Sequence, residues 1–82
     1  MNNIEIFENL KNILVNEIKV SSSITMSTAL IGSQIIDSLD FMNYITIIEE
    51  TYNITISDDD ISNFKLGVIE NMVLYIKEKH IE

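Results

Sequence analysis

The spacing of apolar residues is the feature that most limits what this 82-residue chain can fold into. Three stretches carry aliphatic or aromatic residues at intervals of three and four, which is typical of helices with one apolar face. No stretch alternates apolar and polar residues long enough to build a sheet, and the one candidate, residues 53–57, is too short. The sequence therefore predicts an all-α fold.

Four helices are expected, three longer and one short. Their expected bounds are Ile4 to Ile18, Ser38 to Tyr52, Asp58 to Asn63 and Gly67 to Lys79. Residues 1–82 are enough for one hydrophobic core and not for two, so we expect a single domain. The predicted architecture is an antiparallel four-helix bundle with a long first loop.

Polar residues at the predicted helix ends support these bounds. Asn53 tolerates the left-handed conformation that ends many helices, and Ser57 is a suitable N-cap for the short helix. The aspartates at 58–60 place negative charge in its first turn. Lys77 and Lys79 place positive charge in the last turn of the final helix. Both arrangements complement the helix dipole.

The first loop, VSSSITMSTALIGSQII at residues 20–36, is poor in charge and rich in serine and threonine. These side chains compete for backbone hydrogen bonds and favour loops over helices. Long loops in compact domains tend to be functional or disordered. The apolar residues Ile24, Met26, Leu30 and Ile35 indicate that this loop packs across the bundle.

The charge balance indicates which partners the chain can bind. Thirteen acidic and five basic residues give a net charge of −8, which disfavours nucleic acids and anionic membranes and attracts proteins with basic patches. No apolar run reaches the roughly 18 residues of a membrane span, and the first residues lack the lysines of a signal peptide. We therefore expect a cytoplasmic protein. The chain has no cysteine, so it has no disulfide or thiol of its own.

Neither an active site nor a metal site is predicted. The single histidine, His80, is expected to be a solvated tail residue, and no Gly-x-Ser-x-Gly turn exposes Ser38 for a hydrolase triad. The aspartates at 58–60 lack the alternate spacing, the glycine and the final glutamate of a calcium loop. We expect no catalytic residue and no dedicated metal ligand.

The stretch Asp37-Ser38-Leu39-Asp40 has two interpretations. Asp37 as N-cap and Asp40 three residues later resemble a capping box, with which any helix could begin. Alternatively, Ser38 at the first helical position is displayed there so that a group can be attached to it. The residues alone leave both open.

The apolar side of the helix that follows is expected to contain Leu39, Met42, Ile45, Ile48 and Tyr52. Phe41 falls off this stripe, and we expect it to be partly exposed, where it forms a small contact patch with Leu39 and Met42. Phe7, Tyr52 and Met72 have helical spacing and are expected in the core.

Two motifs resemble a known family, the acyl carrier proteins with their aminoacyl and peptidyl relatives. They are IIDSLDF at residues 35–41 and IIEETYNITISDDDISNF at residues 47–64, and the order of elements agrees from Ile4 to Lys79. The resemblance implies that Ser38 carries 4′-phosphopantetheine, transferred from coenzyme A by a magnesium-dependent phosphopantetheinyl transferase. The thiol of that group holds acyl groups as thioesters, so the protein is implied to be a carrier and not an enzyme.

The resemblance also implies how partners dock, through acidic and apolar side chains that meet basic patches on acyl-loading and acyl-processing enzymes. The matching positions here are Asp37, Leu39, Asp40, Met42, Glu49 and Glu50. We expect a monomer.

Several positions depart from the family pattern. Gln34, Ile35 and Ile36 stand where a glycine is common, the nearest glycine being Gly32, and Ser57 stands where a proline is common. The helix after Ser38 is also less acidic than in housekeeping fatty-acid carriers. These departures favour a discrete carrier of a specialised lipid or natural-product pathway. An aminoacyl, D-alanyl or peptidyl carrier is the alternative within the family, and an unmodified acidic helical interaction module is the alternative outside it.

Overall fold

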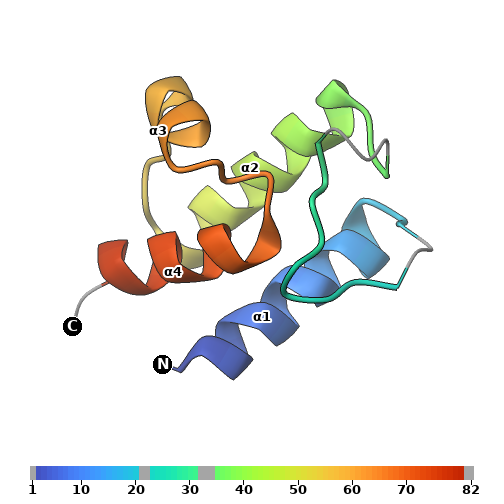
Figure 1. Ribbon diagram of the computed structural model, residues 1–82, viewed down its shortest axis with the longest axis horizontal. Helices are drawn as coiled ribbons and strands as arrows, with labels where there is room; N and C mark the ends of the chain where they lie inside the picture. The colour runs from blue at the N-terminus through green and yellow to red at the C-terminus, as the bar shows by residue number, and fades with distance from the viewer. Residues whose placement is uncertain (1, 21–22, 32–34, 81–82) are drawn as a thin grey trace.

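The computed structural model describes residues 2–20, 23–31 and 35–80, and within these ranges the protein is helical with no strand. The elements are α1 (Asn3–Asn12), the π-helix η1 (Ile13–Glu17), α2 (Ser38–Tyr52), α3 (Asp58–Asn63) and α4 (Ile69–Lys79). In Figure 1, α2 and α4 run in the direction opposite to α1, and the short α3 lies beside them. The all-α bundle with three longer helices and one short helix is confirmed. Its extent as one domain over residues 1–82 stays a prediction.

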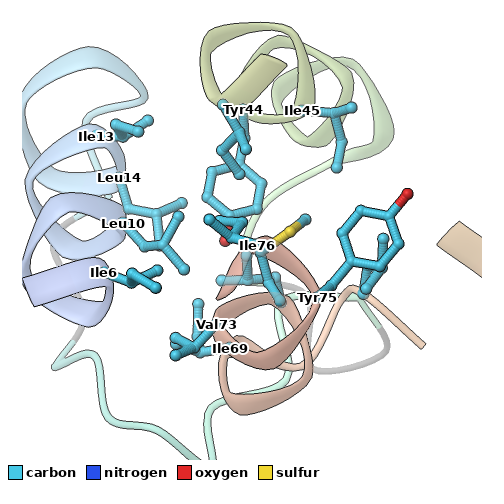
Figure 2. Packing of buried hydrophobic residues seen from close by; sticks show 14 of the residues in the cluster. Ile6, Leu10, Ile13, Leu14, Tyr44, Ile45, Ile69, Val73, Tyr75 and Ile76 are labelled. Carbon is cyan, nitrogen blue, oxygen red and sulfur yellow. The ribbon is translucent and has the colours of Figure 1, made fainter. Parts of the chain in front are cut away.

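The hydrophobic core lies where α1 with η1, α2 and α4 meet (Figure 2). Its fully buried side chains include Ile6, Leu10, Leu14, Tyr44, Ile48, Ile69, Met72, Val73 and Ile76. Met72 and Tyr52 are buried as predicted, whereas Phe7 is half-buried at the edge of the cluster. Each longer helix therefore contributes one apolar face, as the spacing predicted.

The first helix changes its winding before it ends. α1 opens with a capping box in which the Asn2 side chain accepts from the Glu5 N–H at 2.8 Å. From Ile13 the turn widens, and the N–H of Ile18 donates to the carbonyl of Ile13 at 3.1 Å, five residues earlier. The prediction of one regular helix to Ile18 is therefore wrong over its last turn. In the wider turn both Ile13 and its neighbour Leu14 stay buried.

The first loop packs across the bundle, as predicted. Ile24 and Leu30 are buried, and Met26 is half-buried against the core. The N–H of Leu30 donates to the carbonyl of Gly67 at 2.7 Å, next to an isolated antiparallel bridge between Ala29 and Val68. The loop is thus held against the segment that leads into α4.

The start of α4 differs from the prediction because of this loop. Val68 is extended, so the helix begins at Ile69 and not at Gly67. No side chain caps it; instead the N–H of Ile69 donates to the carbonyl of Thr28 at 3.0 Å, and the N–H of Glu70 donates to that of Met26 at 2.8 Å. Loop carbonyls therefore satisfy two of the N–H groups that a helix leaves without intrahelical acceptors.

The short helix α3 has its predicted bounds. Ser57 is its N-cap, and its hydroxyl accepts from the N–H of Asp60 at 3.1 Å. α3 contains no buried residue. The hydroxyl of Tyr75 on α4 donates to the Asp60 carboxylate at 2.6 Å, which joins the two helices.

The buried side of α2 is rotated relative to the prediction. Phe41 is only 3% exposed, whereas Leu39 is 71% and Met42 45% exposed. The buried row starts at Phe41 and continues through Ile45, Ile48 and Tyr52 at spacings of four, three and four. The Phe41 ring contacts that of Tyr44, with centroids 5.8 Å apart. The expectation that Phe41 lies off the buried row and is partly exposed is therefore wrong, and so is the row that joined Leu39 and Met42 to Ile45, Ile48 and Tyr52.

Candidate functional site

Ser38 is the first residue of α2, and its side chain is exposed. Asp37 before it is extended, with φ −88° and ψ 178°, and its carboxylate accepts from the N–H of Asp40 at 2.8 Å. The carbonyl of Asp37 accepts from the N–H of Phe41 at 3.0 Å, the first bond of the helix. The predicted N-cap is confirmed, and it displays Ser38 at the point where the chain enters the helix.

Apolar side chains on both sides of Ser38 fix this entry. Ile35 and Ile36 are half-buried and pack against the core, and Phe41 is buried within it. Ile36 and Phe41 occupy the two positions of a hydrophobic staple, which sets the angle at which a chain enters a helix. The isoleucine pair therefore has a structural role next to the exposed serine.

The charge around Ser38 is one-sided. Between Lys19 and Lys65 the chain has seven acidic and no basic residues, whereas the rest of the chain has six acidic and five basic residues. This segment, which contains α2 and α3, therefore supplies seven of the eight net negative charges. The first-turn N–H groups and the positive end of the α2 dipole are the local features that favour an anion at this end of the helix.

The predicted docking residues fall into two groups on α2. Asp37, Leu39 and Met42 are exposed and Asp40 is half-buried, all around the first turn. The other two are the half-buried Glu49 and the exposed Glu50, about three turns further along the helix. Glu49 has a structural contact, because its carboxylate accepts from the N–H of Ile56 at 2.8 Å.

The chain is similar to known proteins over most of its length. A family model described as "Phosphopantetheine attachment site" matches residues 8–76. The chain belongs to the acyl carrier protein family. It is 35% identical over 74 residues to an acyl carrier protein of Phytoplasma australiense, covering 89% of this chain and 95% of the relative. An acyl carrier protein of Aster yellows witches'-broom phytoplasma is 33% identical over 72 residues, covering 87% of this chain and 92% of the relative. No solved structure matches the chain significantly.

Acyl carrier proteins hold 4′-phosphopantetheine covalently and act as carriers, not as catalysts. The start of α2 suits the attachment of such a group. A phosphodiester needs a hydroxyl that a transferase can reach, and the side chain of Ser38 is exposed. A phosphate at the first helical position also lies near the positive end of the helix dipole. Repulsion from the carboxylates of Asp37 and Asp40 opposes this, and solvent weakens the repulsion most at the exposed Asp37.

His80 is placed where it cannot serve Ser38. The 15 residues of α2 separate Ser38 from Tyr52 by about 20 Å along the helix axis. The ring of His80 contacts the ring of Tyr52, with centroids 5.8 Å apart, at the far end of that helix. His80 is half-buried, so the expectation of a solvated tail residue is wrong. A triad of Ser38 with His80 is incompatible with this fold.

Over residues 2–20, 23–31 and 35–80, no three His, Cys, Asp or Glu side chains gather in a way that could hold a metal ion. None of the helices in the described part of the chain has the length and apolar character needed to cross a membrane.

The sequence did not predict the rotation of α2. The concentration of negative charge around Ser38 is visible in the sequence, since no basic residue occurs between Lys19 and Lys65. The contact between Glu49 and the N–H of Ile56 had no such signal, because it depends on how the chain turns after α2.

Proposed function

We propose that this protein is a discrete acyl carrier protein in which Ser38 carries 4′-phosphopantetheine. The observation that supports this most directly is the exposed serine at the first position of α2, inside the Asp-Ser-Leu-Asp motif of a chain that belongs to the family. When bound, the group supplies a thiol that holds an acyl chain as a thioester. The chain has no cysteine, so this thiol has no competitor within the protein.

The residues around Ser38 position the attachment point and perform no chemistry. The Asp37 cap and the buried Phe41 fix the start of α2, while the Ser38 side chain points to solvent. A flexible arm attached at a fixed point keeps its cargo at a high effective concentration near any enzyme docked beside it. The fold therefore supports delivery of one cargo to several enzymes in turn.

The docking surface that we propose is the exposed part of α2 next to Ser38. Leu39 and Met42 present apolar side chains, and Asp37 and Asp40 present carboxylates beside them. The complementary partner is an enzyme with a basic patch around a shallow apolar depression, including the phosphopantetheinyl transferase. Exposed ion pairs contribute roughly 0–1 kcal/mol each, which suits contacts that form and break repeatedly.

A specialised lipid or natural-product pathway is our proposal for the cargo, with an aminoacyl, D-alanyl or peptidyl cargo as the alternative. It rests on the departures from the family pattern, of which Ile35 and Ile36 have a packing role in the structure. Gly32 and Gln34, two other positions of that comparison, lie outside the described residues. The cytoplasmic location and the monomeric state stay predictions.

Intact-mass measurement tests the attachment site. The purified chain is incubated with coenzyme A, magnesium and a promiscuous phosphopantetheinyl transferase, and we expect the added mass of one phosphopantetheinyl group. Ser38→Ala should gain nothing. Ser57→Ala removes the exposed serine at the N-cap of α3 and should still be modified. An unmodified native chain would favour the alternative of an acidic interaction module, and modification of Ser38→Ala would exclude Ser38 as the site.

A further inference from the structure

Glu49 and Glu50 are neighbours near the end of α2, but their side chains have different surroundings. Glu50 is exposed, whereas Glu49 is half-buried and its carboxylate accepts from the N–H of Ile56 at 2.8 Å. Ile56 is buried and lies in the segment that runs from the end of α2 to α3 along one edge of the molecule in Figure 1. The carboxylate of Glu49 therefore satisfies a backbone N–H that neither helix pairs.

Hydrogen bonds from two neighbouring helices hold α3 and the residues that lead into it. α3 has no buried residue of its own. The Glu49 carboxylate on α2 binds the chain two residues before α3 begins, and the Tyr75 hydroxyl on α4 donates to Asp60 within it at 2.6 Å. Burial, the hydrogen bond to Asp60 and the charges of Asp60 and Glu49 together raise the pKa of Tyr75 to about 12. Glu49 therefore lies close to the contact between α3 and α4 as well.

The periodicity of α2 places the two glutamates on different faces of the helix. Met42, Thr46 and Glu50 follow one another at intervals of four and are all exposed, so they share one face. Glu49 lies four residues after Ile45, which is buried in the core, so it lies on the flank of the buried row. Of the two glutamates, Glu50 therefore shares a face with the apolar side chain of Met42 in the proposed docking surface.

We propose that Glu49 is a positioning residue and not a docking residue: it holds the chain that leads into α3, whereas Glu50 meets the lysine or arginine of a partner enzyme. This inference rests on the proposed carrier function, in which enzymes with basic patches dock along α2. The position of α3 matters for docking because its first turn carries Asp58 and Asp59, which are both exposed. A shift of α3 would move these charges relative to Glu50.

Paired substitutions that separate charge from hydrogen bonding test the proposal. Glutamine removes the charge but keeps an oxygen that accepts a hydrogen bond, whereas alanine removes both. The measured quantity is the KM of the phosphopantetheinyl transferase for each variant chain at low salt. Glu50→Gln and Glu50→Ala should raise this KM equally, by about twofold, because each removes one exposed charge. Glu49→Ala should raise it at least about twofold more than Glu49→Gln, because only the alanine variant loses the acceptor for the Ile56 N–H.

Amide hydrogen exchange of Ile56 measures the same contact without any enzyme. Exchange should be at least about twofold faster in Glu49→Ala than in the native chain, and Glu49→Gln should restore most of the difference. In Glu50→Ala the rate should match that of the native chain. Circular dichroism confirms that all the variants fold.

Three results would overturn the proposal. Equal KM values for Glu49→Ala and Glu49→Gln would show that the acceptor at this position has no role in docking. Native exchange of the Ile56 amide in Glu49→Ala would exclude Glu49 as the residue that holds this segment. A native KM in both Glu50 variants would show that partners do not meet Glu50. If the transferase fails to load the native chain, the proposed function fails, and the exchange rates of Ile56 still decide the role of Glu49.

Discussion

The first N–H groups of α2 and α4 find their hydrogen-bond acceptors in different ways. At α2 a neighbouring side chain, the carboxylate of Asp37, accepts the N–H of Asp40. At α4 the carbonyls of Thr28 and Met26, about 40 residues earlier in the chain, accept the N–H groups of Ile69 and Glu70. The first cap is local and leaves the helix end open to solvent, whereas the second is distant and covers the helix end with a loop.

This difference explains why only one of the two helix starts is suited to attachment of a group. Ser38 is exposed, and a phosphate there could approach free N–H groups of the first turn. Ile69, the first residue of α4, is fully buried, and the acceptors for its first turn are supplied by the loop. The loop therefore stabilises α4 but covers its first residue. The cap of α2 leaves the first residue of that helix accessible to solvent and to other proteins.

The largest expected effect comes from detaching the loop that caps α4. Leu30 is fully buried and its N–H donates to Gly67 at 2.7 Å, so Leu30→Ala should lower the free energy of unfolding by about 3 kcal/mol. Chemical denaturation followed by circular dichroism measures this. Its neighbour Ile31 is 54% exposed, and Ile31→Ala should change the free energy by no more than about 0.5 kcal/mol. Equal losses in the two variants would contradict the anchoring role of Leu30.

Two buried tyrosines differ in whether their hydroxyl groups have a hydrogen-bond partner. The Tyr75 hydroxyl donates to Asp60, whereas the fully buried Tyr44 hydroxyl has no hydrogen-bond partner among the described residues. A buried unpaired group costs about 1–3 kcal/mol. Tyr44→Phe should therefore stabilise the protein by about 1 kcal/mol, and Tyr75→Phe, the same chemical change, should destabilise it by about 1 kcal/mol.

The stability of the protein at alkaline pH depends on the same two tyrosines, Tyr44 and Tyr75. Burial, and then the hydrogen bond to Asp60, raise the pKa of Tyr75 to about 12, and burial raises the pKa of Tyr44 as well. Both tyrosine pKa values are higher in the folded state than in the unfolded state. The neutral tyrosines therefore make their full contribution to the free energy of unfolding below pH 10, and this contribution is lost as the pH rises above 10. Chemical denaturation at pH 8 and pH 11 measures how much the free energy of unfolding falls between them. This decrease should be smaller in Tyr44→Phe and in Tyr75→Phe than in the native chain. An unchanged loss in both would contradict this assignment.

At the start of α2 the expected effect is smaller, because the cap is one local hydrogen bond. Asp37→Ala should lower the free energy of unfolding by about 1 kcal/mol, and Asp37→Asn, which retains a capping side chain, by much less. Thermal or chemical denaturation compares the three chains. If the alanine and asparagine variants were equally destabilised, the Asp37 carboxylate would act by its charge and not as the cap.

The distinction between local and distant contacts also explains what the sequence could predict. Both ends of α2 and the start of α3 matched, because Asp37, Asn53 and Ser57 act within four residues of themselves. Asn53 indeed adopts the left-handed conformation, with φ 55°. The first residue of α4 did not match, because the bonds that fix it come from the first loop. The π-helical turn at Ile13 also carried no local signal.

The candidate site shows a second kind of limit. The motif places Ser38 at the start of α2, as the structure has it, but Phe41 was assigned to the wrong side of that helix. Met42, Ile45 and Ile48 repeat at a spacing of three, which drifts around a helix, whereas Phe41, Ile45, Ile48 and Tyr52 average close to 3.6. Only the second row stays on one side of the helix over three turns. Because apolar residues occur at both spacings, the sequence alone did not determine which side of α2 faces the core. Packing against the other helices determines it.

The smallest expected effect concerns the charge that separates the α2–α3 segment from the rest of the chain. Salt screens repulsion among its seven acidic residues, so raising sodium chloride from 0.05 to 0.5 M should stabilise the fold by roughly 0.5 kcal/mol, or about 2–4 °C in Tm. Glu50→Gln removes an exposed charge from this segment and should reduce that gain, whereas Glu8→Gln on α1 should not. Thermal melts at the two salt concentrations measure both. A Tm that does not rise with salt, or an equal response of the two variants, would show that the repulsion is not concentrated in this segment.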